Sequence, residues 1–346
     1  MKTITVSAPG KLMLLGEHAV VYGKPCIVTA VGQRMKATVE LTEAKDFELE
    51  APDVKVTGYK KPMADLGNGE IPKGAKFVEI AVKNFFNSHP ERSEGSLDSF
   101  QNKSGDSSQA RNDKKFGIRI TTKSEFSSEF GFGSSSASTV CVIKALSEIT
   151  SANLDQKAIF DLSYKTVLDI QGKGSGFDVA AAVYGGTLYY VIGGKVLEPI
   201  KIDSFPLIVG YTGIKYDTVA LINEVSKKAE KYPKVIENVY SQIEGLVNKA
   251  RTALQNKDYA ILGELMNFNE GYLSILGVEG KKLADMIYAA REAGAYGAKL
   301  SGAGIGDCMI TIAPEDKIPA VKNGIIEANG QVINVETNVE GVRVEG

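Results

Sequence analysis

The pattern of apolar and polar residues in the first third of the chain predicts strands mixed with helices. Residues 36–41 (KATVEL) alternate like a half-buried strand, and residues 116–121 (FGIRIT) also read as a strand. Residues 77–86 (FVEIAVKNFF) carry apolar side chains at helical spacing and predict an amphipathic helix. Residues 1–6 favour a short strand over a secretion signal, because no long apolar stretch follows them.

Helical patterns dominate the later parts of the chain. Residues 136–149 are apolar over most of a helical circumference, which indicates a buried helix. Asn153, with Gln156 three residues later, indicates the cap of a following helix that runs to about residue 169. Long helical patterns cover residues 217–293. Further strand patterns lie at residues 188–192, 206–211, 308–312 and 332–344.

This order of elements predicts an α+β fold with two lobes divided near residue 190. We expect a mixed N-terminal lobe at residues 1–190 and a C-terminal lobe of helices and an antiparallel sheet at residues 191–346. Residues 88–115 contain almost no apolar side chain and cannot bury enough surface to fold alone. We interpret them as a disordered or floppy surface insertion, whose deletion is expected to leave folding and turnover almost intact.

The composition narrows the function classes. The chain has 346 residues, 43% of them hydrophobic and 24% charged, which is the balance of a soluble globular protein. Its formal net charge of −2 gives no electrostatic case for binding nucleic acid or an anionic membrane. No run approaches the roughly 20 apolar residues that a membrane span needs. The three cysteines lie far apart in sequence, which indicates reduced thiols in a cytoplasmic protein rather than a metal site.

Four glycine-rich segments carry the candidate chemistry, because each adjoins an apolar strand or helix pattern. The first, residues 9–23, places Lys11 just after an expected Pro-Gly turn, where a solvated surface lysine is the alternative interpretation. The same segment holds Glu17 and His18 inside an apolar run, which is costly unless both side chains find partners. His18 is either a ligand-binding residue or a hydrogen-bonded structural one.

The second segment has the composition of a phosphate-binding loop. Residues 131–136 (GFGSSS) lead directly into the buried helix, whose N-terminus offers unpaired N–H groups and a positive dipole end. Glycines let a phosphate approach the backbone, and serine hydroxyls can bind phosphate oxygens or Mg²⁺. The segment matches neither GxxxxGK[ST] nor GxGxxG, so the two common nucleotide folds are disfavoured. A serine-capped helix after a flexible loop is the alternative.

The remaining two segments each allow two interpretations. In residues 172–178 a glycine-rich turn precedes Asp178, which is either a helix cap or a carboxylate placed to accept a hydroxyl proton. Residues 297–306 precede a strand, so they form either a tight β connection or a second loop over nucleotide or substrate.

Taken together, these segments resemble the motif set of the GHMP small-molecule kinase family, named for galactokinase, homoserine kinase, mevalonate kinase and phosphomevalonate kinase. The resemblance covers most of the chain apart from the polar insertion, and three separated motifs occur in the family's order. Residues 7–23 (SAPGKLMLLGEHAVVYG) and 212–218 (TGIKYDT) look most like the mevalonate kinase branch. The resemblance implies a two-lobed fold with the active site between the lobes.

The implied activity is ATP-dependent phosphorylation of the 5-hydroxyl of mevalonate in isoprenoid precursor biosynthesis, with ATP and Mg²⁺ as cofactors. The expected partners are mevalonate and ATP, without nucleic acid or membrane, and a homodimer is compatible with the sequence. By resemblance, Asp178 is the catalytic aspartate and Lys11 the lysine paired with it. The ATP phosphates are expected at Gly131, Gly133, Ser134, Ser135 and Ser136, with Ser135 also a Mg²⁺ ligand. The expected mevalonate contacts are Glu17, His18 and Thr218, and the expected active-site loop contains Gly302, Ala303 and Gly304.

Several departures from the family pattern keep alternatives open. Animal-type members carry a glutamate Mg²⁺ ligand where this chain has Val167, and Asp169 is the nearest carboxylate that can replace it. The segments around Asp178 and residues 301–308, with Ile305 at a usual glycine position, look more like phosphomevalonate kinase. That enzyme needs extra cations for its phosphorylated substrate, which Lys173 and Lys215 can supply, whereas Glu17 and His18 suit a neutral hydroxyl better. The absent glutamate also leaves open a catalytically inactive, metabolite-binding regulator.

Overall fold

The structure is a computed structural model that describes residues 2–89 and 116–346 of the chain, so the predicted insertion lies largely outside the described residues. The described residues form two sheets. The larger sheet has the strand order β12-β1-β2-β5-β3-β4, and β6 joins it through β2 and carries β7. Its strands are β1 (Thr3–Leu15), β2 (Cys26–Thr42), β3 (Asp46–Ala51), β4 (Val56–Pro62), β5 (Gly117–Ser124), β6 (Thr187–Val191), β7 (Val196–Pro199) and β12 (Arg343–Val344).

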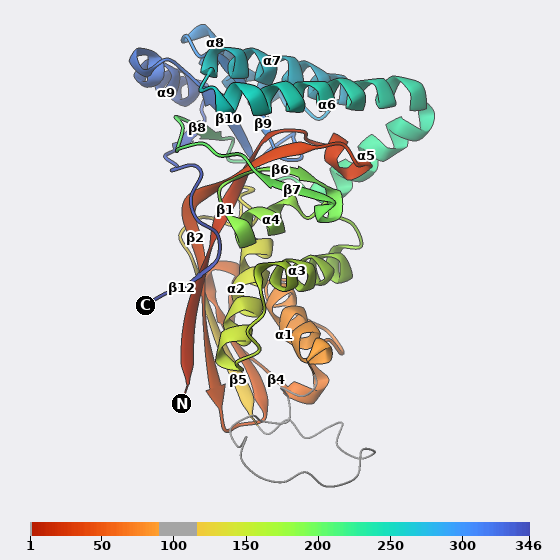
Figure 1. Cartoon of the computed structure of the whole chain (residues 1–346), viewed down its shortest axis with the longest axis vertical. Helices are drawn as coiled ribbons and strands as arrows, with labels where there is room; N and C mark the ends of the chain where they lie inside the picture. Colours follow the sequence, from red (N-terminus) through yellow and green to blue (C-terminus); the bar gives the residue numbers. More distant parts are fainter. Residues whose placement is uncertain (1, 90–115) are drawn as a thin grey trace.

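The long antiparallel pair β1–β2 forms the spine of this sheet (Figure 1). The predicted turn at Pro9 and Gly10 is wrong, because both residues and Lys11 lie inside β1. A shift of register between Pro9 and Gly10 accommodates the proline, which has no N–H to donate to the ladder. Beyond this irregularity Lys11 lies opposite Ala30, so its side chain is fixed by a central strand rather than by a loop.

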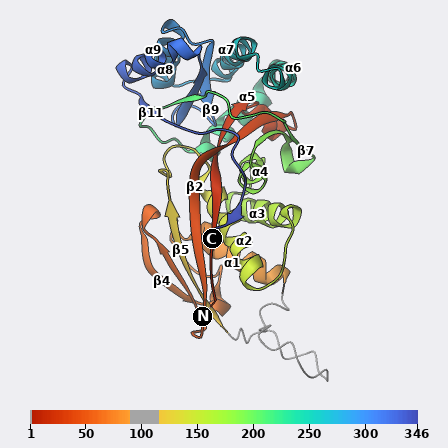
Figure 2. The ribbon, with the colours of Figure 1, turned by 60° about the vertical axis from the view of Figure 1, so that its left-hand side comes forward.

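Four helices cover one face of the larger sheet (Figures 1 and 2). They are α1 (Lys76–Ser88), α2 (Ser134–Ile149), α3 (Gln156–Gln171) and α4 (Phe177–Tyr184). The predicted buried helix is confirmed as α2, which packs against β1 and β2. The predicted cap of α3 lies two residues too early. Asp155, not Asn153, is the N-cap and accepts a hydrogen bond from the Ala158 N–H at 2.8 Å, whereas Asn153 has a left-handed backbone conformation with φ 53°.

The smaller sheet is antiparallel, with the order β11-β8-β10-β9. Its strands are β8 (Ile208–Tyr211), β9 (Gly297–Ser301), β10 (Cys308–Ile312) and β11 (Gln331–Ile333). The predicted helical region contains α5 (Thr218–Lys231), α6 (Pro233–Gln255), α7 (Tyr259–Leu276) and α8 (Lys281–Glu292), and α9 (Ile318–Glu327) follows β10. Figure 1 shows α6 to α9 gathered at the end of the molecule beside this sheet. None of the helices in the described ranges is long and apolar enough to cross a membrane.

The predicted α+β class is confirmed, and one strand assignment is wrong. Residues 332–344 are not a single strand, because β11 ends at Ile333 and β12 pairs with β1 of the other sheet. Asn338 between them has φ 61°, a left-handed conformation outside the β region. The chain passes from the larger to the smaller sheet after Pro199. The strand that ends there, β7, still pairs with β6 of the larger sheet, and the next strand, β8, belongs to the smaller one. The division into lobes near residue 190 stays a prediction.

Candidate active site

The four glycine-rich segments of the sequence meet at the end of β1. Lys11 connects the first segment to the second, because its backbone N–H donates to the Phe132 carbonyl at 3.0 Å. Its ammonium donates to the Gly131 carbonyl at 2.7 Å and lies 5.3 Å from the centre of the Phe177 ring, in the third segment. The Lys11 side chain is therefore held between the expected phosphate loop and the helix that carries Asp178.

The glycines of the loop are required by its geometry. Gly131 and Gly133 have φ values of 73° and 79°, which side-chain-bearing residues rarely adopt. A Cβ at Gly131 would lie 2.8 Å from a carboxylate oxygen of Asp307, and one at Gly133 would lie 3.3 Å from Cε of Lys11. Lys11 and Asp307 therefore approach the loop backbone as closely as packing permits.

The N-terminus of α2 is open to an anion. Its N-cap is Gly133 and no side chain caps it, so the alternative of a serine-capped helix does not hold. The first-turn N–H groups and the positive end of the helix dipole therefore face the loop. Ser134 and Ser135 are partly exposed, whereas Ser136 is buried. The first two hydroxyls are thus open to a bound phosphate, and the contact of Ser136 with ATP stays a prediction.

Asp178 is the second residue of α4, behind an N-cap glycine, so it is not a helix cap. Its Oδ2 accepts a hydrogen bond of 2.5 Å from Ser136 Oγ, which joins the third segment to the second. The side chain is only partly buried and can still meet a substrate. Burial lowers the pKa of Lys11, while the negative charges of Asp178 and Asp307 act in the opposite direction. The nearby carboxylates thus favour the charged ammonium in a dry environment.

His18 joins the first segment to the fourth. Its Nε2 donates to the Ala303 carbonyl at 2.8 Å, in the loop that contains Gly302 and Gly304. The residue has φ 59° and is 6% exposed. Burial lowers its pKa most, the hydrogen bond to Ala303 raises it and the charge of Lys228 lowers it. The net pKa lies below the ordinary histidine value, so the imidazole is neutral near pH 7. A neutral ring that donates through Nε2 presents Nδ1 as an acceptor, which suits a substrate hydroxyl.

Glu17 points into the interior rather than toward the loop. Its carboxylate forms an ion pair with Lys299 of β9 and accepts from the Asn269 amide of α7 at 3.2 Å. Glu17 is 1% exposed and Lys299 is fully buried. The sequence argument required a partner for Glu17 but did not identify Lys299, although a lysine inside an apolar strand is the same signal. The contact of Glu17 with mevalonate stays a prediction.

Two other predicted residues lie at the margin of this arrangement. Thr218 is the exposed first residue of α5, behind the N-cap Asp217. Asp169 of α3 accepts hydrogen bonds from Asn84 at 2.9 Å and from Lys165 at 2.8 Å. Neither of those partners belongs to the four segments. Its assignment as a Mg²⁺ ligand stays a prediction.

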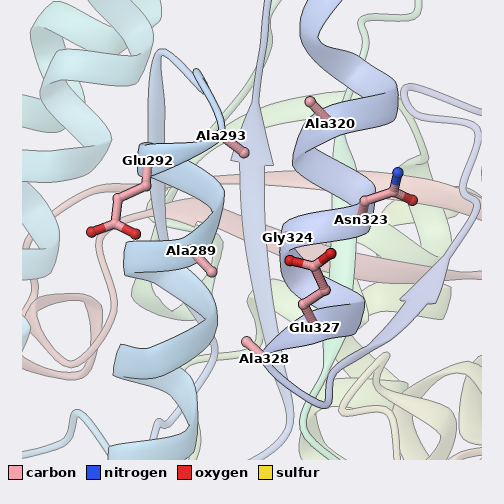
Figure 3. Close-up of a pocket in the computed structure, with 8 residues that line it drawn as sticks. All are labelled: Ala289, Glu292, Ala293, Ala320, Asn323, Gly324, Glu327 and Ala328. Carbon is pink, nitrogen blue, oxygen red and sulfur yellow. The ribbon is translucent and has the colours of Figure 1, made fainter.

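The described residues contain no group of three or more His, Cys, Asp or Glu side chains that could hold a metal alone. Mg²⁺ in kinases needs only one or two protein oxygens besides the phosphates, and Ser135 with one carboxylate would offer that chemistry. A cavity of about 600 Å³ lies elsewhere, between α8 and α9, where Ala289 and Ala293 face α9 (Figure 3). Its described lining includes Glu292 and Glu327 without a basic side chain, so it would repel a nucleotide.

Comparisons with known proteins identify the family of the chain. Models of the N-terminal and C-terminal domains of GHMP kinases match residues 95–186 and 250–331. The mevalonate kinase of Pyrococcus furiosus is 35% identical over 100% of this chain and 99% of its own length. That of Pyrococcus horikoshii is 34% identical over 100% of this chain and 98% of its own. The solved mevalonate kinase of Methanococcus jannaschii is 24% identical, covers 97% of this chain and 98% of its own, and superposes with a TM-score of 0.77. This chain belongs to the GHMP kinase family.

Proposed function

We propose that this chain is an ATP-dependent kinase that phosphorylates the 5-hydroxyl of mevalonate. The observation that carries the proposal is the convergence of Lys11, the open N-terminus of α2 and Asp178, with Lys11 bonded to the loop and Asp178 bonded to Ser136. Phosphoryl transfer requires mainly positioning and charge stabilisation, and these groups supply both. The full-length similarity to curated mevalonate kinases supports the choice of substrate.

The chain's own residues account for nucleotide binding. The phosphates of ATP bind at the backbone of the 131–136 loop and the first turn of α2, where N–H groups and the helix dipole favour negative charge. Ser134 and Ser135 add hydroxyl donors. Mg²⁺, which shields the charge of the phosphates when bound, would be held by Ser135 and one carboxylate.

Asp178 activates the acceptor hydroxyl. Because Ser136 donates to Oδ2, the other oxygen, Oδ1, is oriented to accept the proton of the substrate hydroxyl. The charge of Lys11 attracts this carboxylate and stabilises the negative charge that develops on the transferred group. The burial of Lys11 strengthens both effects, because water screens its charge less there.

Phosphorylation of 5-phosphomevalonate is the second candidate, and the two lysines proposed for it have other partners. Lys173 is exposed and donates to Asn223 at 2.6 Å, and the Lys215 charge is paired with Asp307 at 3.0 Å. Asp307 holds Lys215 beside Gly131 of the phosphate loop. The neutral His18 beside Ala303 favours a hydroxyl-bearing acceptor instead.

A coupled ADP-release assay with Mg²⁺-ATP tests the proposal, with mevalonate and 5-phosphomevalonate offered separately. Turnover with mevalonate alone is the expected result. Turnover with the phosphorylated compound alone would establish the second candidate. ATP hydrolysis at one slow rate, whatever alcohol is added, would indicate an inactive regulator.

We also expect a cytoplasmic location. The three cysteines are free and buried, and burial raises the pKa of Cys26, Cys141 and Cys308. Such thiols are poorly reactive, as suits a reducing compartment. A homodimer remains a prediction, which light scattering of the purified protein can test.

A further inference from the structure

Asp307 occupies an unusual backbone conformation at the active site. It is 5% exposed and has φ 58°, a left-handed value that costs free energy for a residue with a side chain. Its N–H donates to the Ile214 carbonyl at 2.8 Å, and its carbonyl accepts from the Thr212 N–H at 3.0 Å. The backbone is thus fixed between β10 and the 212–218 segment, and this fixes the direction of the carboxylate.

The Asp307 carboxylate lies between the phosphate loop and Lys215. Its Oδ2 faces Gly131, where an added Cβ would come within 2.8 Å of it. Its Oδ1 accepts from the Lys215 ammonium at 3.0 Å. The Asp307 carboxylate therefore links the Lys215 ammonium to Gly131, whose carbonyl accepts the hydrogen bond from Lys11. Both charges also reach Lys11, since Asp307 raises and Lys215 lowers its pKa, each by less than burial does.

The Lys215 ammonium is available to a ligand. Its side chain is 43% exposed, whereas that of Asp307 is 7% exposed. An ammonium has three donors, and the bond to Asp307 engages one of them. The remaining donors can bind phosphate oxygens, which prefer charged donors.

We propose that Asp307 is a positioning residue that holds the Lys215 ammonium at the 131–136 loop, where Lys215 binds the terminal phosphates of ATP. The inference rests on the proposed function only in placing ATP at this loop. It assigns Lys215 to the nucleotide rather than to mevalonate, because its anchor Asp307 packs against Gly131 of the loop, whereas the neutral His18 lies on the Ala303 side. The left-handed conformation of Asp307 is held by its backbone hydrogen bonds to Ile214 and Thr212.

Calorimetric titration of the purified protein with AMPPNP and with AMP tests the role of Lys215. In Lys215→Met, AMPPNP affinity is expected to fall about tenfold or more, because a charge-assisted bond to the terminal phosphates is lost. AMP affinity should stay the same, since AMP lacks those phosphates. Lys215→Arg should recover much of the loss. Lys257→Met, which breaks the exposed pair with Asp203, is the matched control and should change neither affinity.

Asp307→Gly tests the positioning role. Glycine adopts the left-handed conformation without strain, so the thermal unfolding midpoint should stay the same or rise, while AMPPNP affinity falls as in Lys215→Met. The double variant should lose no more than either single one, because both remove the same contact.

Unchanged AMPPNP affinity in Lys215→Met, or equal losses for AMP and AMPPNP, would overturn the inference. So would a raised KM for mevalonate with normal AMPPNP affinity, which would assign Lys215 to the carboxylate of mevalonate. If Asp307→Gly does not fold, Lys215→Met alone still tests the inference. Lys215 lies on an exposed segment, so its replacement is expected to leave folding intact. A parent protein that binds AMPPNP but does not phosphorylate mevalonate would refute the proposed function and leave this test intact.

Discussion

Replacing Lys299 with methionine probes the buried ion pair that joins the two sheets. Lys299 lies in β9 of the smaller sheet, and its partner Glu17 follows β1 of the larger sheet. Methionine keeps the length and apolar contacts of the side chain but leaves the Glu17 carboxylate, 1% exposed, without its cation. The variant therefore measures the cost of an uncompensated buried charge.

The expected loss of unfolding free energy is about 3 kcal/mol at pH 7. Breaking a buried ion pair from one side costs about 3–5 kcal/mol. An unpaired buried carboxylate can instead take up a proton. Protonating an ordinary glutamate at pH 7 costs about 3.7 kcal/mol, so the cost of losing the cation cannot much exceed this value. The Asn269 amide, at 3.2 Å from the carboxylate, offsets about 1 kcal/mol of the remaining charge.

Urea denaturation followed by far-ultraviolet circular dichroism is the suitable assay, because the chain contains no tryptophan. Glu17→Gln combined with Lys299→Met should be more stable than Lys299→Met alone, since a neutral amide removes the unpaired charge. The reasoning is refuted if Lys299→Met loses less than about 1 kcal/mol, or if the double variant loses the sum of the single losses. Normal stability with a raised KM for mevalonate in Glu17→Gln would instead favour the substrate contact predicted from the sequence.

Three further predictions concern the acid–base groups. Asp178→Asn should lower kcat at least about 100-fold and leave AMPPNP affinity nearly unchanged, and near-normal turnover would exclude the base assignment. Lys11→Ala should lower kcat more than it weakens ATP binding in single-turnover and titration experiments, and an equal kcat would contradict the role of Lys11. Burial raises the pKa of Glu270 to about 7, so the folded protein holds a proton that the unfolded chain has already released above pH 4.5. Unfolding free energy should therefore fall by on the order of 3 kcal/mol as pH rises from about 4.5 to 7. Glu270→Gln should remove this slope, and an unchanged slope in that variant would contradict the assignment.

The four glycine-rich segments could be found from sequence because each has a strong local signal. The helix at residues 134–149 is apolar on most sides. Gly131 and Gly133 before it have positive φ values, which glycine adopts most easily. Such features depend on neighbours in the chain, so local patterns are enough to reveal them. The similarity of spacing to a known family then indicated that the segments share one site.

The contacts that orient the site depend on residues far apart in the sequence. Glu17 meets Lys299 across 282 positions, and Lys215 meets Asp307 across 92. No local pattern specifies either pairing. A charged residue in an apolar run indicates that it needs a partner, but it does not indicate which residue that partner is. The strand position of Pro9 and Gly10 was missed for a similar reason, since the bulge that admits them is set by pairing with β2.

The central claim is that phosphate is transferred from ATP to the 5-hydroxyl of mevalonate. Phosphorus NMR of the product formed by the purified protein from Mg²⁺-ATP and mevalonate tests it most directly, because mevalonate offers a primary and a tertiary hydroxyl. Our account predicts a new phosphomonoester resonance that is split by the neighbouring methylene protons, and its loss with Asp178→Asn. An unsplit monoester resonance from the tertiary hydroxyl, or inorganic phosphate alone, would contradict it.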